Sequence, residues 1–388
     1  MLFRSDYDGA LAEHIEQLLV TIGADGKLLL DREGQVDQVN LAEKLLVPLL
    51  SKLGNLVIDG GIWMNTQRPE WNDANNALAG YGLSMVTLYH LNSYLTSLRD
   101  LIDRRGGTVP LSGAVAGWFS DLATALTSAE PSLAATEEAA RRELFDQLGR
   151  AGEAYRHLAW ESFDTSGHEV PASEVVAFLD AALGHLTAAI DTAKRKDGLY
   201  DAYNLVSFPS GDVARVSRLG PMLEGQVAVL SSGALDPAGS LGVVEALFES
   251  GMYRADQATF MLYPVKELPR FLDKNTVRDP ALGELAGRLA EAGIIVLDRD
   301  GGIHFTPGMT NATDLAEALT EAGFDPSDQA TVQAAYEATF DHHSFTGRSG
   351  SMYGYEGIGS IFWHMVGKLL VAIQDRKSTR LNSSHVRT

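Results

Sequence analysis

Separately punctuated amphipathic helices follow one another along most of the 388 residues. Apolar side chains at helical spacing mark one face of several of them, as at Leu88, Leu91, Leu95, Leu98 and Ile102. Such stripes indicate helix packed on helix rather than isolated helices. Helices are expected over residues 8–21, 40–53, 77–102, 111–126, 136–163, 172–193 and 358–374. The pattern predicts an all-α fold of serial helical hairpins, either a toroid or a two-domain bundle.

Three later helices are expected to begin at Asp-Pro steps: Asp236-Pro237, Asp279-Pro280 and Asp325-Pro326. Aspartate caps the free amides of the first turn, while proline fits the first helical position at little cost. Between the last two of these helices, the apolar residues 294–297 and residues 303–305 flank the polar, glycine-containing segment Asp298–Gly302. This pattern predicts a small β-hairpin. The strands are thus expected to be minor additions to a helical fold.

The two ends of the chain read as foreign sequence. Residues 375–385 are what a common sequencing adapter encodes when translated, and residues 2–5 match the opposite adapter. We therefore expect residues 1–5 and 375–388 to pack against nothing, as a fusion scar would. Residues 6–374 are then expected to be a fragment of one catalytic domain.

Charge and composition exclude several functions. A net charge of −20 makes nucleic acid and anionic membranes unsuitable partners. The chain lacks cysteine, which excludes disulfides and thiolate metal sites. The sequence has no unbroken run of eighteen apolar residues, so no membrane span is predicted. We expect a cytoplasmic protein with neither cofactor nor metal.

The most polar segment is residues 67–76, which carries two carboxylates, four carboxamides, an arginine and a tryptophan. Pro69 blocks a helix at this point, so the segment should form a loop at a helix N-terminus, where binding side chains are often displayed. Trp71 offers a flat face for a sugar ring, and Asn72 and Asp73 offer hydrogen bonds to hydroxyl groups. The alternative is that Asp73 caps its helix and Trp71 anchors the loop.

Trp71-Asn72-Asp73, followed by Gly80, Gly82, Ser84 and an apolar helix, resembles the general-acid motif of the cellobiose-phosphorylase-like glycoside phosphorylases. Pro69-Glu70 stands where that family has Gly-Asp. The resemblance implies an (α/α)₆ toroid, here an incomplete barrel, with Asp73 as the acid that protonates the glycosidic oxygen. The residues then expected to bind the sugar are Arg68, Glu70, Trp71, Asn72 and Asn76.

Two middle segments also combine acids, aromatics and arginines. Residues 196–204 place Asp201 and Tyr203 just past a helix, which fits a sugar subsite or a glycine-terminated turn with solvated charges. Residues 215–226 place Arg218 and Glu224 around a helix start. Their position is similar to the stretch before the second half of the family's barrel, where Gln226 and Ser232-Gly233 match loosely.

The third segment, residues 341–357, is rich in glycine and hydroxyl groups and precedes a helix. Such a loop can present backbone amides to an anion. The residues expected to contact sugar or phosphate here are His343, Arg348, Ser349 and Tyr355. Neighbouring histidines without a partner at helical spacing make a weak metal signal, and a structural glycine-rich turn is the alternative.

These segments predict a carbohydrate-active enzyme that cleaves a β-glucoside or related oligosaccharide with inversion. The three loops should then converge around Asp73. Hydrolysis, slightly preferred, needs a base about 6.5 to 9.5 Å from the acid, and Glu356, Glu224 or Asp201 would provide it. A phosphorylase would use inorganic phosphate and need no base. A toroid that binds glycans or a protein without turnover is the remaining alternative.

Overall fold

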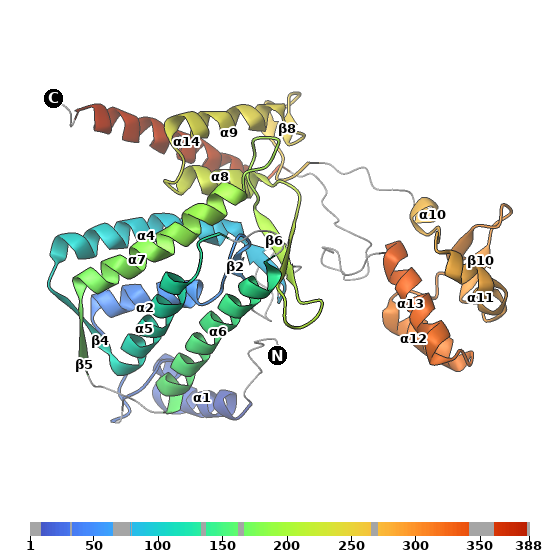
Figure 1. Ribbon diagram of the computed structural model, residues 1–388, viewed down its shortest axis with the longest axis horizontal. Coiled ribbons are helices and arrows are strands. Elements are labelled where there is room, and N and C mark those ends of the chain that lie inside the picture. Colours follow the sequence, from blue (N-terminus) through green and yellow to red (C-terminus); the bar gives the residue numbers. More distant parts are fainter. Residues whose placement is uncertain are drawn as a thin grey trace. The chain divides into compact units, whose positions relative to one another are not determined.

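The computed structural model describes residues 9–31, 33–64, 78, 80–132, 137–161, 167–264, 271–340 and 361–385, with backbone alone at 160–161, 271–272 and 376–385. The chain divides into two compact units (Figure 1). The main unit contains the described residues up to Pro264 and those from 361 onward. The second unit contains residues 271–340. In sequence, the second unit is therefore inserted between two parts of the main unit.

A five-stranded antiparallel sheet in the main unit contradicts the predicted all-α toroid. Its strands are β1 (Leu56–Val57), β2 (Gly61–Trp63), β3 (Gly82–Ser84), β6 (Tyr203–Ser207) and β7 (Arg215–Arg218), in the order β1-β2-β3-β6-β7. Strands of two to five residues are too short for alternation to be read from the sequence. The pairing of β3 with β6 also joins segments about 120 residues apart. The fold is mixed α/β, with helices packed around a curled sheet.

Helices build the rest of the main unit, close to the predicted ranges. They are α1 (Gly9–Ile22), α2 (Leu41–Leu53), α4 (Met85–Arg105), α5 (Gly113–Ser128), α6 (Glu138–Glu161), α7 (Ala172–Thr192), α8 (Leu223–Ser231), α9 (Pro237–Glu249) and α14 (Trp363–His385). A short 3₁₀ helix, η1 (Gly23–Lys27), follows α1. Helices α4 and α7 lie side by side (Figure 1). Their buried stripes, which include Leu88, Leu95, Leu179 and Leu186, form the centre of the core.

Helix α7 is long and apolar enough to cross a membrane by length and composition alone. Its apolar stripe is buried against α4 and α5 instead, with Val175 and Leu179 fully covered. This is the pattern of a core helix, in which the apolar face is covered by neighbouring helices.

Two helix starts differ from the predicted ones because short strands precede them. The helix expected from residue 77 begins at Met85, where Ser84 ends β3 and its hydroxyl accepts a 3.0 Å hydrogen bond from the amide of Thr87. The helix expected from residue 111 begins at Gly113, after β4 (Thr108–Ser112) pairs with β5 (Gly167–Pro171). In both places the predicted helix includes apolar residues of the strand that precedes the observed helix.

Helix α6 packs against the sheet through aromatic side chains. Phe145 meets the ring of Trp63 edge-on, with ring centres 5.1 Å apart. Arg141, buried on the same helix, donates to the backbone oxygens of Ile58 at 3.0 Å and Ala214 at 3.1 Å. These contacts fix the sheet, whose strand β6 carries the polar residues of the candidate site. A further hairpin pairs β8 (Tyr253–Arg254) with β9 (Thr259–Phe260).

The second unit has its own core. It consists of α10 (Phe271–Lys274), α11 (Pro280–Glu291), β10 (Ile295–Leu297), β11 (Ile303–Phe305), α12 (Ala312–Glu321) and α13 (Pro326–Phe340). The β-hairpin predicted at residues 294–305 is confirmed. Phe305 packs edge-on against Tyr336, with ring centres 4.9 Å apart. A separate aromatic core is what an independently folding unit requires.

The Asp-Pro helix starts are confirmed in both units. Asp236 accepts a 2.6 Å hydrogen bond from the amide of Gly239, and Asp279 accepts one of 2.9 Å from Ala281. Asp325 accepts from Ser327 and Asp328. The cap residue thus satisfies amides that the helix itself leaves unpaired.

Helix α14 continues across the expected boundary of foreign sequence at residue 375. Its described buried side chains, Met365, Leu369 and Ala372, all precede that boundary. The side chains of residues 376–388 and the whole of residues 1–8 lie outside the described part, so their expected lack of packing stays a prediction.

Candidate functional site

The segment that carries the predicted general acid joins β2 to β3. Its predicted site residues, Arg68, Glu70, Trp71, Asn72, Asp73 and Asn76, lie outside the described residues, as do His343, Arg348, Ser349, Tyr355 and Glu356. The described ends of the connection are fixed to each other: the amide of Gly80 donates to the oxygen of Met64 at 2.7 Å, and Met64 donates to Gly82 at 2.8 Å. The connection therefore starts and ends on one β-hairpin.

That hairpin is paired with β6, which begins at the predicted sugar-binding residue Tyr203, just after Asp201. In the β3–β6 register, Ser84 lies opposite Tyr203 and Gly82 lies opposite Leu205. Gly80 and Ser84 are four residues apart, or about 13 Å along an extended strand. The polar residues of β6 and the anchor of the 65–77 connection thus share neighbouring strands of one sheet.

Asp201, just before β6, is a fully buried carboxylate between two arginines. Its Oδ1 accepts a 3.2 Å hydrogen bond from Arg195, and its Oδ2 is contacted by Nη1 of Arg218. Burial raises the pKa of Asp201, while the two guanidinium groups oppose that rise. The hydroxyl of Tyr89 on α4 also donates to the backbone oxygen of Asp201 at 2.8 Å.

Both arginine partners of Asp201 reach solvent, and the side chain of Arg195 is 24% exposed. The side chain of Arg218 is 41% exposed, against 0% for Asp201. Arg195 is held further by Asp197 at 3.3 Å and by the oxygen of Leu219 at 3.1 Å. Arg218 is therefore the more accessible of the two arginines, and Asp201 fixes its orientation.

Tyr203 and Glu224 form the second polar pair. The Tyr203 hydroxyl, on β6, donates a 3.0 Å hydrogen bond to Oε2 of Glu224 in the first turn of α8. Gly225 allows this approach, because a Cβ there would lie 2.9 Å from the Cα of Ala202. Burial raises the pKa of Tyr203, and it also raises the pKa of the Glu224 carboxyl against the opposing effects of Tyr203 and Lys368.

Two further titratable side chains lie near this pair and were missed by the sequence analysis. Lys368 on α14 acts electrostatically on Glu224 and also on His90 of α4. Burial first, and Lys368 second, lower the pKa of His90. Helix α8 contacts both α4 and α14, which explains how three segments distant in sequence meet. Nothing in the sequence around Lys368 or His90 sets either residue apart, so no sequence signal was available to find them.

Gln226, which matched the family loosely, has a structural role. Its side chain is fully buried, its Oε1 accepts from the amide of Tyr200 at 2.8 Å, and its Nε2 donates to the oxygens of Tyr200 at 2.7 Å and Met222 at 3.0 Å. A fully bonded buried amide fixes the turn before β6 to the start of α8. It thereby helps to place Glu224 beside Tyr203.

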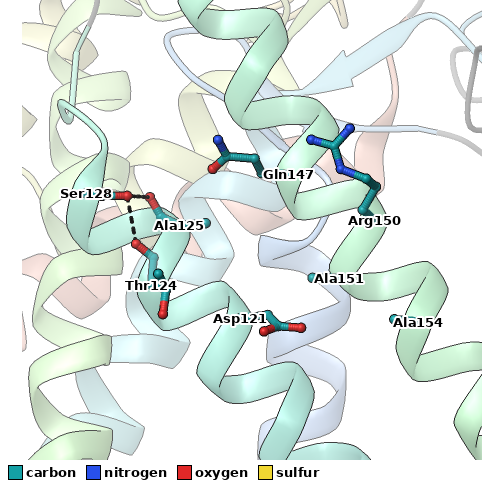
Figure 2. A pocket seen from close by; sticks show the side chains of 8 residues that line it. All are labelled: Asp121, Thr124, Ala125, Ser128, Gln147, Arg150, Ala151 and Ala154. Carbon is teal, nitrogen blue, oxygen red and sulfur yellow. Dashed lines mark hydrogen bonds between the residues drawn. The ribbon is translucent and has the colours of Figure 1, made fainter.

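A separate groove of about 440 Å³ lies between α5 and α6 in the main unit. Figure 2 shows Asp121 and Thr124 projecting from α5, and Gln147 and Arg150 from α6. Small residues, Ala125, Ala151 and Ala154, line it where the helices approach. None of these lining residues was predicted to have a function, and neither Tyr203 nor Glu224 is among them.

Of the predicted site residues, the structure brings the four described ones into two pairs: Asp201 with Arg218, and Tyr203 with Glu224. The convergence of residues 67–76 and 341–357 on this region lies outside the described residues. Burial raises the pKa of the Glu224 carboxyl, which is hydrogen-bonded to Tyr203 and acted on electrostatically by Lys368. Such a carboxyl is a candidate for holding or transferring a proton.

Residues 268–343 match the family model of GH149 phosphorylase insertion domain 2. The matched range covers the described second unit, 271–340, so the segment recognised by its sequence is also a compact unit inserted within the main one. No curated protein matches the chain. The match covers about one fifth of the 388 residues. It supports a relationship to glycoside phosphorylases and a carbohydrate-active enzyme.

Proposed function

We propose that the chain is part of a glycoside phosphorylase that cleaves a β-glucoside or related oligosaccharide with inversion. The observation that carries this proposal is the match of residues 268–343 to an insertion domain of GH149 phosphorylases. The resemblance of Trp71-Asn72-Asp73 to a phosphorylase general-acid motif supports it from a different part of the chain. The match favours phosphorolysis over the hydrolysis that the sequence analysis slightly preferred.

In the proposed reaction, a phosphate oxygen attacks the anomeric carbon as the glycosidic C–O bond breaks. Asp73 donates its proton to the leaving oxygen, so the products are a sugar 1-phosphate of inverted configuration and an oligosaccharide shortened by one sugar. Phosphate is already a nucleophile and needs no carboxylate base. His343, Arg348 and Ser349 are the proposed phosphate contacts, because cationic and hydroxyl side chains suit an anion.

Arg218 and Glu224 are the described residues that we assign to the substrate site. Arg218 is 41% exposed and oriented by a buried carboxylate, which is the arrangement of a fixed hydrogen-bond donor. Glu224 is half-buried and hydrogen-bonded to Tyr203. Its carboxyl group can accept a hydrogen bond from a sugar hydroxyl when ionised and donate one to it when protonated. Strand β6, which carries Tyr203, pairs with the strand that follows the 65–77 connection.

The deciding experiment is an assay of β-glucan oligosaccharides with the protein produced from its full reading frame, with and without inorganic phosphate. Phosphorolysis predicts a sugar 1-phosphate that appears only when phosphate is present. Release of free sugar at the same rate without phosphate would show hydrolysis, with Glu224 or Glu356 as the base to test next. Binding of the oligosaccharide without any product would support the non-catalytic alternative.

Asp73→Asn is the matched variant for the proposed acid. Asparagine caps a helix nearly as well as aspartate but has no acid proton to donate. We expect loss of turnover with oligosaccharide binding retained. Turnover within a few-fold of the unsubstituted protein would remove Asp73 from the mechanism.

A further inference from the structure

His304 lies on β11 of the second unit, opposite Val296 of β10. Its imidazole contacts two oxygen atoms. Nε2 is 3.0 Å from Oδ2 of Asp298, and Nδ1 is hydrogen-bonded to the backbone oxygen of Asn275. The side chain thus joins the turn of the β10–β11 hairpin to the segment that precedes α11.

Both of these oxygen atoms are acceptors. A backbone carbonyl has no proton to donate, and the Asp298 carboxyl is ionised, because His304 and the amides of Gly302 and Asp300 lower its pKa. A neutral imidazole carries a single N–H and can satisfy one of the two acceptors. The protonated ring carries two and satisfies both. The geometry therefore fits imidazolium.

The electrostatic surroundings agree with the geometry. The hydrogen bond that His304 donates to Asp298 raises the pKa of His304. Burial opposes this rise, and the oxygen of Asn275 and the charge of Asp298 add to it. Among the described residues, Asp298 is the charged side chain that shifts the pKa of His304. Other charges on the adjoining segments are Lys274 and Arg278 around Asn275, and Arg299 and Asp300 in the hairpin turn.

The two acceptors belong to parts of the second unit that hold its shape. On the turn side, Oδ1 of Asp298 accepts from the amides of Asp300 at 2.8 Å and Gly302 at 2.7 Å. A Cβ on Gly302 would meet Oδ2 of Asp298 at 2.5 Å, so a larger residue there would displace the Asp298 carboxylate. Opening the His304 contact therefore removes one of the hydrogen bonds that hold the side chain organising the turn.

On the core side, Asn275 is buried and its side chain bonds both backbone groups of Phe305, at 2.9 Å to the amide and 2.8 Å to the oxygen. Phe305 packs against Tyr336 and Phe340. His304 thus connects the exposed turn to a polar clamp on the aromatic core.

We propose that His304 is a protonation-dependent latch that keeps the β10–β11 hairpin closed and loosens it when the imidazole loses its proton. A group whose pKa is raised on folding contributes stability that is present below its unfolded pKa of 6.5 and is lost as pH rises through the raised value. The Asp298 contribution is lost at the acid end, as pH falls through its lowered pKa. The latch is closed between these limits. This inference is independent of the proposed catalytic reaction.

The test uses the whole chain and two measurements between pH 5.5 and 9. The first is the NMR titration of the His304 ring, assigned by its absence in His304→Gln. The second is the hydrogen exchange of the amides of Gly302 and Phe305, corrected for the intrinsic pH dependence of exchange. We expect the His304 pKa above 6.5 and protection that falls as pH rises. Opening should increase about tenfold for each unit by which that pKa exceeds 6.5.

The control is His304→Gln, which can donate from its amide to one acceptor but does not titrate. Its protection should be independent of pH across the same range. A His304 pKa at or below 6.5, or a pH dependence of protection identical in the two proteins, would overturn the latch. If the variant fails to fold, the hydrogen exchange of the Gly302 and Phe305 amides in the unsubstituted protein decides the question, and protection that does not fall as pH rises would overturn the latch.

Discussion

The Tyr203 hydroxyl donates a 3.0 Å hydrogen bond to Glu224 and so joins strand β6 to the first turn of α8. This donor stabilises the ionised carboxylate against a burial that raises its pKa. Tyr203→Phe removes the donor and leaves the ring, so the pKa of Glu224 should rise further. A ¹³C NMR titration of the glutamate carboxyl groups, with Glu224→Gln to assign the signal, measures the change. An unchanged or lower pKa would contradict the assignment.

Glu224→Gln tests whether the Glu224 carboxyl serves the reaction or the stability of the fold. Because the folded pKa is raised, the folded state binds a proton that the unfolded state releases, so the free energy of unfolding falls as pH rises from 4.5 through the raised value. Glutamine removes that fall and keeps an acceptor for Tyr203. We expect stability at pH 7 to be unchanged or higher, by urea denaturation between pH 4 and 8, while activity drops. A variant that is less stable but equally active would make Glu224 structural.

Asp201→Asn tests the buried carboxylate between the two arginines. Removing one partner from a buried ion pair costs about 3–5 kcal/mol, and the partial exposure of Arg218 should bring the loss to about 2–4 kcal/mol. Asp197→Asn is the matched control, since Asp197 contacts the same Arg195 from the surface and should cost less than about 1 kcal/mol. Chemical denaturation of both variants compares them. Equal losses would show that burial does not distinguish the two contacts.

The C-terminal boundary can be tested on helix α14. Leu369 is buried, so Leu369→Ala should cost about 2–5 kcal/mol through lost burial and the cavity left behind. Truncation after Asp375 removes the residues predicted to be foreign and should change the free energy of unfolding by less than about 0.5 kcal/mol. Thermal denaturation measures both. A large loss on truncation would show that the tail packs against the main unit.

The sequence located most helices because their signals are local. A buried stripe such as that of α7 recurs within one segment, and an aspartate before a proline caps its own helix. The sheet depends on pairings such as Ser84 with Tyr203, which nothing local specifies. Strand β1 has two residues, so no periodicity is available to read. The mixed fold was therefore beyond a pattern analysis that detects helices well.

The residues of the candidate site also fall into those that a local sequence pattern indicates and those that it does not. Asp201, Tyr203, Arg218 and Glu224 stood out because polar residues cluster in their segments, although the partners within the cluster were not predicted. Lys368 and His90 were missed, because nothing in their own segments sets them apart and their relation depends on the contacts of α8 with α4 and α14. Distance in sequence, rather than residue type, limited what was found.

The insertion of the second unit within the main one sets an order of assembly during synthesis. Helix α8 ends at Ser231, and its partner α14 begins at Trp363, so the ribosome must complete the second unit before this contact can form. At roughly 5–20 residues per second, the intervening stretch takes on the order of ten seconds to translate. The described residues of the second unit, 271–340, are continuous in sequence and have a core of their own, so this unit can fold before α14 is made. Until α14 emerges, the apolar face of α8 that it covers stays exposed, and this is the period in which a chaperone would protect the nascent chain.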